Sequence, residues 1–198
     1  MAKLKRPGLQ LSRKIRLEQR VGERPKPVDK KPPFDYRCVK TYKKASCFRR
    51  VNNVALVGTE RLVVDEKSLA DANIGQTNEN FKRFFIGKIE ENVATTVISI
   101  DHLEGGPLDG EILVELGYRA EMKLVYLFEL TKNQFAGDFG YLTNGGYPNI
   151  AYAVGNDGRW WGLEIMWDSG NKWWIINATY VNIYSARGAG CQVISIDF

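Results

Sequence analysis

Short apolar runs recur along the second part of the chain, roughly every 8 to 15 residues from Val51 onward, and turn-forming residues separate them. This spacing is typical of β-sandwiches and barrels and differs from that of βαβ units. Strands are predicted at residues 54–57, 61–64, 95–101, 111–116, 123–129, 149–154, 159–167, 172–177, 181–185 and 192–196. The pattern therefore predicts an all-β domain, an antiparallel sandwich or a barrel-like fold.

One segment has the periodicity of a helix instead. Within residues 68–91, four apolar side chains fall at positions i, i+3, i+4 and i+8, which lie on one helical face: Phe81, Phe84, Phe85 and Ile89. We therefore expect one short helix beside the strands.

Two tight turns frame the most informative strands. Asn156-Asp157-Gly158 and Asp168-Ser169-Gly170-Asn171 each offer residues that tolerate a positive φ, as hairpin turns require. All five tryptophans lie in the two strands that meet at the second turn. Because side chains alternate along a strand, both faces of this hairpin receive indole rings.

Both faces of the tryptophan hairpin cannot easily be core. In one interpretation, one face fills the core while a loop, a sheet or a partner covers the other. In the alternative, exposed rings stack on sugar or form a protein interface. We expect Trp161 and Trp167 to face the core, and Trp160 and Trp174 to contact a partner.

Charge divides the chain into two parts. Residues 1–50 carry 17 Lys and Arg against four Asp and Glu, a net +13, whereas the remainder has 11 basic and 19 acidic residues, a net −8. Such asymmetry is typical of an arm that binds a negative partner, although a solubilising tail has the same composition. We expect an extended basic arm over residues 1–50 and the β domain over residues 51–198.

The arm combines prolines, basic residues and rings. Five prolines exclude long regular structure, and aromatic residues alternate with Lys and Arg toward residue 50. This alternation suits phosphate contact with base stacking, and it equally suits an edge strand whose rings face a core. The arm residues expected to contact a partner are Arg13, Lys14, Arg16, Phe34, Tyr36 and Tyr42.

The chain offers few groups for catalysis or metal binding. His102 is the single histidine, Cys38, Cys47 and Cys191 lack CxxC spacing, and neither GxGxxG nor GxxxxGK[ST] occurs. We expect no catalytic residue, no cofactor and no metal. The apolar runs are too short to span a membrane and no apolar stretch follows the N-terminal charges, which predicts a soluble chain without a signal peptide.

One region resembles a known family. Residues 140–185 contain Asn144-Gly145-Gly146-Tyr147-Pro148-Asn149, an aromatic strand, Ile165-Met166-Trp167-Asp168, a short turn, Trp173-Trp174-Ile175-Ile176 and Tyr184-Ser185. This order resembles a small tryptophan-containing β-module of phage tail-fibre and other virion structural proteins, from which the extra Trp160, Trp161 and Trp174 depart. The resemblance covers less than a quarter of the chain.

The resemblance implies a virion structural protein that acts as capsid decoration, adaptor or tail-associated component. Its place would be the virion, assembled in the host cytoplasm, and its partners other virion proteins or copies of itself. We expect a non-enzymatic protein whose β domain seats on a protein lattice while the arm extends between neighbours, with nucleic acid contact through the arm left open. Two alternatives are a ribosome- or nucleoprotein-associated RNA-binding protein and a carbohydrate-binding module.

Overall fold

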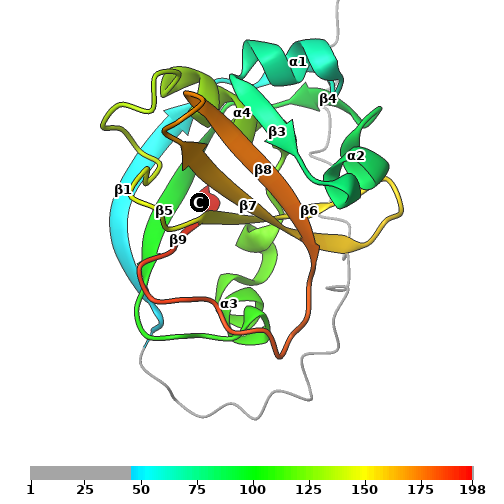
Figure 1. Cartoon of the computed structure of the whole chain (residues 1–198). Helices are drawn as coiled ribbons and strands as arrows, with labels where there is room; N and C mark the ends of the chain where they lie inside the picture. Colours follow the sequence, from blue (N-terminus) through cyan, green and yellow to red (C-terminus); the bar gives the residue numbers. More distant parts are fainter. Residues whose placement is uncertain (1–45, 198) are drawn as a thin grey trace, which may run out of the picture. The chain divides into compact units, whose positions relative to one another are not determined.

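The computed structural model describes residues 46–197, so most of the expected arm, including all six of its predicted contact residues, lies outside the described part. The described residues form strands and short helices in one succession (Figure 1). In chain order these are β1 (Phe48–Leu56), β2 (Thr59–Val63), α1 (Glu66–Asp71), β3 (Ile74–Thr77), α2 (Glu79–Phe85), β4 (Ile89–Val93), β5 (Thr96–Leu103), α3 (Asp109–Leu116), the 3-10 helix η2 (Gly117–Ala120), α4 (Leu124–Asn133), β6 (Asn149–Val154), β7 (Trp160–Asp168), β8 (Trp173–Tyr180) and β9 (Gln192–Asp197).

A large mixed sheet organises the domain. Its seven strands follow the order β1-β5-β9-β6-β7-β8-β3, and β2 pairs with β4 in a separate small sheet. The β-rich class expected from the sequence is confirmed, but the sheet is not purely antiparallel, because β6 pairs with β9 and β3 pairs with β8 in parallel. The parallel pairing of β6 with β9 arises because the chain crosses back after β8, through residues 181–191, and places β9 between β5 and β6.

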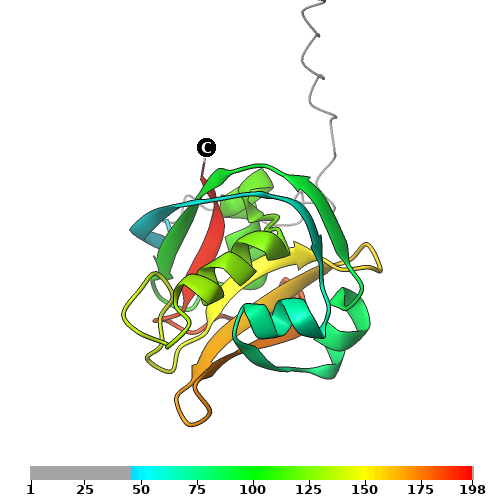
Figure 2. The same cartoon turned by 90° about the horizontal axis from the view of Figure 1, so that it is seen from above.

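Two of the expected strands are helices. Residues 124–129 belong to α4, with Lys123 as its N-cap, and residues 111–116 belong to α3, so these strand predictions are wrong. Seven of the ten residues of α4 are buried, and a helix that is apolar on nearly all sides shows no helical periodicity that would distinguish it from a buried strand. Figure 2 shows α4 over one face of the sheet, with β1 and β5 bending around it.

The single helix expected within residues 68–91 is divided into α1, β3, α2 and β4. Phe81 and Phe85 are buried in α2 as the pattern predicts, but Ile89 begins β4 and is exposed. Gly87, at φ 77°, lies just after α2, where a left-handed residue favours the end of a helix. Residues 181–185, also expected as a strand, form part of the crossover after β8.

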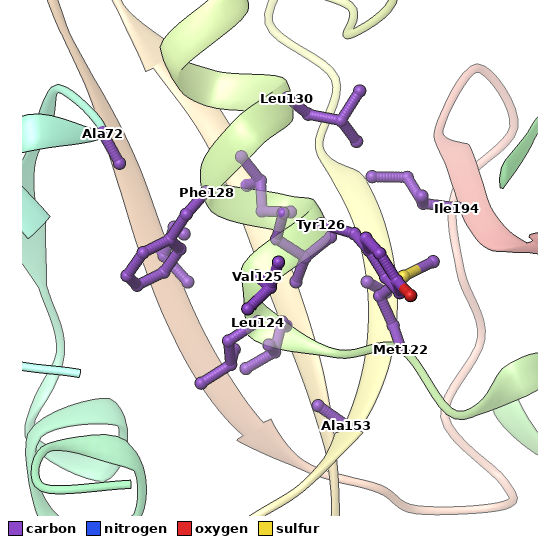
Figure 3. Close-up of a cluster of buried hydrophobic side chains, with 14 of the residues drawn as sticks. Ala72, Met122, Leu124, Val125, Tyr126, Phe128, Leu130, Ala153 and Ile194 are labelled. Carbon is purple, nitrogen blue, oxygen red and sulfur yellow. The ribbon is translucent and has the colours of Figure 1, made fainter. Parts of the chain in front are cut away.

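Two apolar clusters lie on opposite faces of the large sheet. The larger one packs α4 against the sheet, and Figure 3 shows its side chains around that helix, with Met122, Ala153 and Ile194 beside it. Alternation along β5 separates the clusters: Ile98 and Ile100 belong to the larger, whereas Leu103 joins the smaller with residues of α3. Among residues 46–197, no helix has the length and apolarity needed to cross a bilayer.

Candidate partner-binding site

The tryptophan hairpin forms as predicted, but its rings are distributed differently. β7 and β8 pair antiparallel, with Trp167 directly opposite Trp174. Residues opposite each other in such a pair share a face, so both rings lie on the side of Trp161: Trp174 belongs to the larger cluster, and the partly buried Trp167 packs against it. The indoles of Trp167 and Trp174 meet edge to face at 5.2 Å. Trp174 is fully buried, which contradicts its expected place on the partner-contacting face.

The other two indoles lie on the opposite face and are half-buried. The ring of Trp173 covers Gly75 of β3 so closely that a Cβ at that glycine would overlap it. Trp160 packs against the smaller apolar cluster. Its expected role in partner contact stays a prediction.

The most exposed rings lie outside the hairpin, in the connection between α4 and β6. We call residues 134–148 the aromatic loop (yellow-green in Figure 1). Three rings within seven residues are open to solvent: Phe135 by 57%, Phe139 by 104% and Tyr141 by 42%, and we call these the contact rings. Tyr147, further along the loop, is also exposed and packs partly against Gly190.

A buried glutamine closes the aromatic loop. The Gln134 side-chain amide donates to the Asp138 carbonyl at 2.7 Å and to the Leu142 carbonyl at 2.9 Å, while its oxygen accepts from the Leu142 N–H at 3.0 Å. One side chain thus joins both ends of a compact Ω-type loop. Because the contact rings lie between or beside these bonded residues, they project from a fixed backbone.

The aromatic loop is seated on the tryptophan hairpin. The Trp174 indole N–H donates to the Gln134 carbonyl at 3.1 Å, and Gly137 lies so close to the Trp167 ring that a Cβ there would overlap it. The Asn73 side chain donates to the carbonyls of Phe135 and Lys172, which ties the loop to the β7–β8 turn. The loop therefore covers the larger apolar cluster at Trp167 and Trp174, yet its own contact rings remain exposed.

Charge is nearly absent from the aromatic loop. Asp138 is the only Asp, Glu, Lys, Arg or His in residues 134–148, in a chain of which 26% of residues are charged. An apolar, preorganised surface with a single charge is suited to association, because ordering it on binding costs little conformational entropy.

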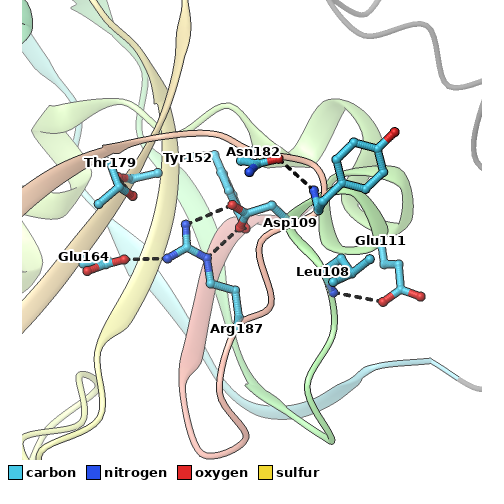
Figure 4. Close-up of polar contacts among 10 residues, drawn as sticks. Leu108, Asp109, Glu111, Tyr152, Glu164, Thr179, Asn182 and Arg187 are labelled. Carbon is cyan, nitrogen blue, oxygen red and sulfur yellow. Dashed lines mark hydrogen bonds and ion pairs between the residues drawn. The ribbon is translucent and has the colours of Figure 1, made fainter.

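A polar network lies on the face of the large sheet that is opposite α4, where the 181–191 crossover meets α3. Arg187 from the crossover binds Asp109 through two hydrogen bonds, Nε to Oδ1 at 2.6 Å and Nη2 to Oδ2 at 3.1 Å, and its third nitrogen donates to Glu164. The Tyr152 hydroxyl donates to Asp109 Oδ1 at 2.6 Å (Figure 4). Gly162 gives the guanidinium room, since a Cβ there would lie 2.8 Å from Arg187 Nη2.

The electrostatics of this network favour a structural role. Burial, together with the charge and hydrogen bonding of Asp109, raises the pKa of Tyr152 well above its usual range. Burial alone lowers the pKa of Arg187, but its contacts with Asp109 outweigh this effect and raise it. The phenol is therefore neutral and the guanidinium charged at physiological pH, and both are engaged in fastening the crossover to α3 and the sheet.

The two described cysteines are buried and free. Burial, with the neighbouring carboxylate of Glu115 at 3.2 Å from the sulfur, raises the pKa of the Cys47 thiol to about 12, and burial also raises the pKa of Cys191. Both thiols are thus poor nucleophiles. His102 lies near the end of β5, and residues 46–197 contain no cluster of three His, Cys, Asp or Glu side chains suited to a metal ion.

The contact rings were not among the residues that the sequence singled out. The signal was the spacing of Phe135, Phe139 and Tyr141 among glycines, in a stretch with one charge. The five tryptophans attracted attention instead, although Trp161 and Trp174 are core residues and Trp167 packs against the same core.

Comparisons with protein-family models, with curated proteins and with solved structures gave no match for this chain. The resemblance to the virion β-module therefore stays a prediction.

Proposed function

We propose that this chain is a non-enzymatic assembly protein that attaches to a protein partner through the contact rings of its aromatic loop. The observation that carries this proposal is the full exposure of Phe139, flanked by Phe135 and Tyr141, on a loop fixed by the Gln134 amide. A ring held in water contributes no burial to folding, so its stabilising contribution is expected in a contact with another molecule.

The polar groups of the domain support a binding role. Arg187, Asp109 and Tyr152 are occupied by one another, and both described thiols have raised pKa values. These groups fasten the crossover and the start of β1, which leaves the aromatic loop as the better candidate for contact with another molecule.

The biological setting that we propose is a virion, in which the domain is a decoration, adaptor or tail-associated component. The charge distribution supports an assembly role: the +13 of residues 1–50 and the −8 of the remainder allow the arm of one copy to approach the domain of a neighbour. An RNA-binding role would use the same arm, and a carbohydrate-binding role would use the same rings, so both are outcomes that the test must distinguish.

The test is incorporation into a large assembly. The tagged full chain is expressed in the cells that naturally produce it, and lysates are separated on a density gradient with and without nuclease. We expect the wild type to sediment with a protein assembly and Phe139→Ser/Tyr141→Ser to remain in the light fractions with an unchanged melting temperature. Tyr184→Ser, which removes an exposed tyrosine from the crossover, is the matched control and should sediment as the wild type does.

Three outcomes would overturn the proposal. Equal incorporation of the loop variant and the wild type would remove the aromatic loop from the assembly contact. Loss of wild-type sedimentation after nuclease treatment would assign the association to nucleic acid, and release by soluble sugars would assign it to a glycan.

A further inference from the structure

We infer that the aromatic loop binds a second copy of this chain, with two aromatic loops meeting across a two-fold axis. This inference rests on the proposed function and specifies the partner of the same surface. It follows from three properties of the loop: its exposed area, its charge and its rigidity.

The exposed area suits a weak symmetric dimer. An aromatic side chain has about 200 Å² of surface, so the exposed fractions of the three contact rings correspond to about 400 Å² per copy. A standard interface covers about 800 Å² on each partner, of which the apolar centre is only a part. The contact rings can thus form the centre of such an interface, and the β7–β8 turn that Asn73 joins to the loop can contribute to its rim.

The charge distribution permits self-contact. In a two-fold interface a patch faces its own copy, so a patch with one predominant charge repels itself. The aromatic loop carries only Asp138, and the adjoining β7–β8 turn carries both signs in Asp168 and Lys172. An apolar centre with a single charge, beside a turn with charges of both signs, repels its own copy only weakly, whereas the strongly basic residues 1–50 would repel themselves.

The rigidity of the loop lowers the entropic cost of association. The Gln134 amide, the Asn73 side chain and the Trp174 indole N–H all bond to loop backbone in the isolated domain. The contact rings therefore need no backbone rearrangement before they meet those of a second copy.

Sedimentation velocity of the purified full chain tests the inference over concentrations from about 1 to 100 μM, the range of a weak dimer. We expect the wild type to shift from monomer to dimer as its concentration rises. Phe139→Ser/Tyr141→Ser should weaken the dimer by about tenfold or more, the usual effect of losing central aromatic contacts. Tyr184→Ser is the matched control and should dimerise as the wild type does.

A charge exchange at one position tests the symmetry itself. Near a two-fold axis Phe139 faces its own copy, so Phe139→Glu and Phe139→Lys should each be monomeric alone through like-charge repulsion. Mixed in equal amounts, the two variants should form a heterodimer. Failure of the mixture to associate any better than either variant alone would contradict a two-fold contact at Phe139.

The two proposals fail in different ways. A wild type that stays monomeric at about 100 μM, or a loop variant that dimerises as the wild type does, overturns the self-contact. If the same loop variant is nevertheless absent from the assembly fractions of the density gradient, the proposed function stands, and the aromatic loop binds a different protein. If the loop variant behaves as the wild type in both experiments, both proposals fail.

Discussion

Trp174 and Phe139 belong to segments that share a hydrogen bond, from the Trp174 indole to the Gln134 carbonyl, yet their exposures lie at opposite limits. Trp174 is 0% exposed, inside the larger cluster, whereas Phe139 is 104% exposed. The hairpin buries two of its five indoles, Trp161 and Trp174, and packs the partly buried Trp167 against the same cluster. The aromatic loop covers one end of that cluster and leaves its own rings in water.

This difference separates two uses of aromatic residues. A buried ring contributes most of its surface to the stability of the fold, so its presence needs no partner to explain it. An exposed ring on a fixed backbone contributes little to folding, and three of them close together indicate a contact surface.

Truncation of a buried ring should have the largest effect. We expect Trp174→Ala to lower the free energy of unfolding by about 3 to 5 kcal/mol through lost burial and a cavity, and Phe139→Ala to change it by less than about 0.5 kcal/mol. Urea denaturation of both variants measures this difference. Similar losses for the two would show that the aromatic loop belongs to the core.

The contact between the loop and the hairpin should be sensitive to one methyl group. Gly137 has φ 68° and its added Cβ would overlap the Trp167 ring, so Gly137→Ala should cost about 2 to 4 kcal/mol from backbone strain and overpacking. Gly146→Ala is the matched control, because Gly146 has φ 89° and open space around it. It should cost only about 1 to 2 kcal/mol of backbone strain. Equal melting temperatures for the two variants would contradict the close packing on Trp167.

Removal of the loop's polar closure should release the loop without unfolding the domain. Gln134→Leu leaves the N–H and carbonyl of Leu142 without that partner, which should cost about 1 to 3 kcal/mol. Hydrogen exchange within residues 135–142 should become faster, while exchange in β7 and β8 should change little. Unchanged exchange in the loop would show that Gln134 does not hold it.

The smallest effect concerns the turn of the hairpin. Hydrogen bonds from the Asn171 side chain and from the N–H groups of Asn171 and Gly170 lower the pKa of Asp168. A carboxylate with a lowered pKa supports the turn above its ordinary pKa, and this support is lost as the pH falls through the value in the folded state. NMR titration should show the pKa of Asp168 move back toward about 3.9, the ordinary aspartate value, in Asn171→Ala. No movement would mean that Asn171 does not bond the carboxylate.

Local turn chemistry predicted the two C-terminal hairpins. Asn156-Asp157-Gly158 and the Asp168 turn define the hairpins β6–β7 and β7–β8, with Gly158 at φ 74°. In the second turn the positive φ, 61°, falls on Lys172, one residue beyond the predicted turn. Helices α3 and α4 were missed because burial on most sides removes the periodicity on which helix prediction depends. The parallel pairing of β6 with β9 depends on the 181–191 crossover, which local patterns do not determine.

The site was harder to predict than the fold. Alternation along β7 and β8 could be read from the sequence, but the register that places Trp174 opposite Trp167 could not, so the buried and open faces of β8 were reversed. The contact rings were missed because exposure depends on tertiary packing, here on Gln134 folding the loop against Trp167.

Photo-crosslinking from Phe139 tests the central claim most directly. The full chain carrying p-benzoylphenylalanine in place of Phe139 is irradiated in the cells that naturally produce it, beside a chain with the same group in place of the exposed Tyr184. If the contact rings are the assembly contact, position 139 should yield a discrete covalent product with another polypeptide, and position 184 should yield little. Equal yields from the two positions, or no product from position 139, would contradict the account.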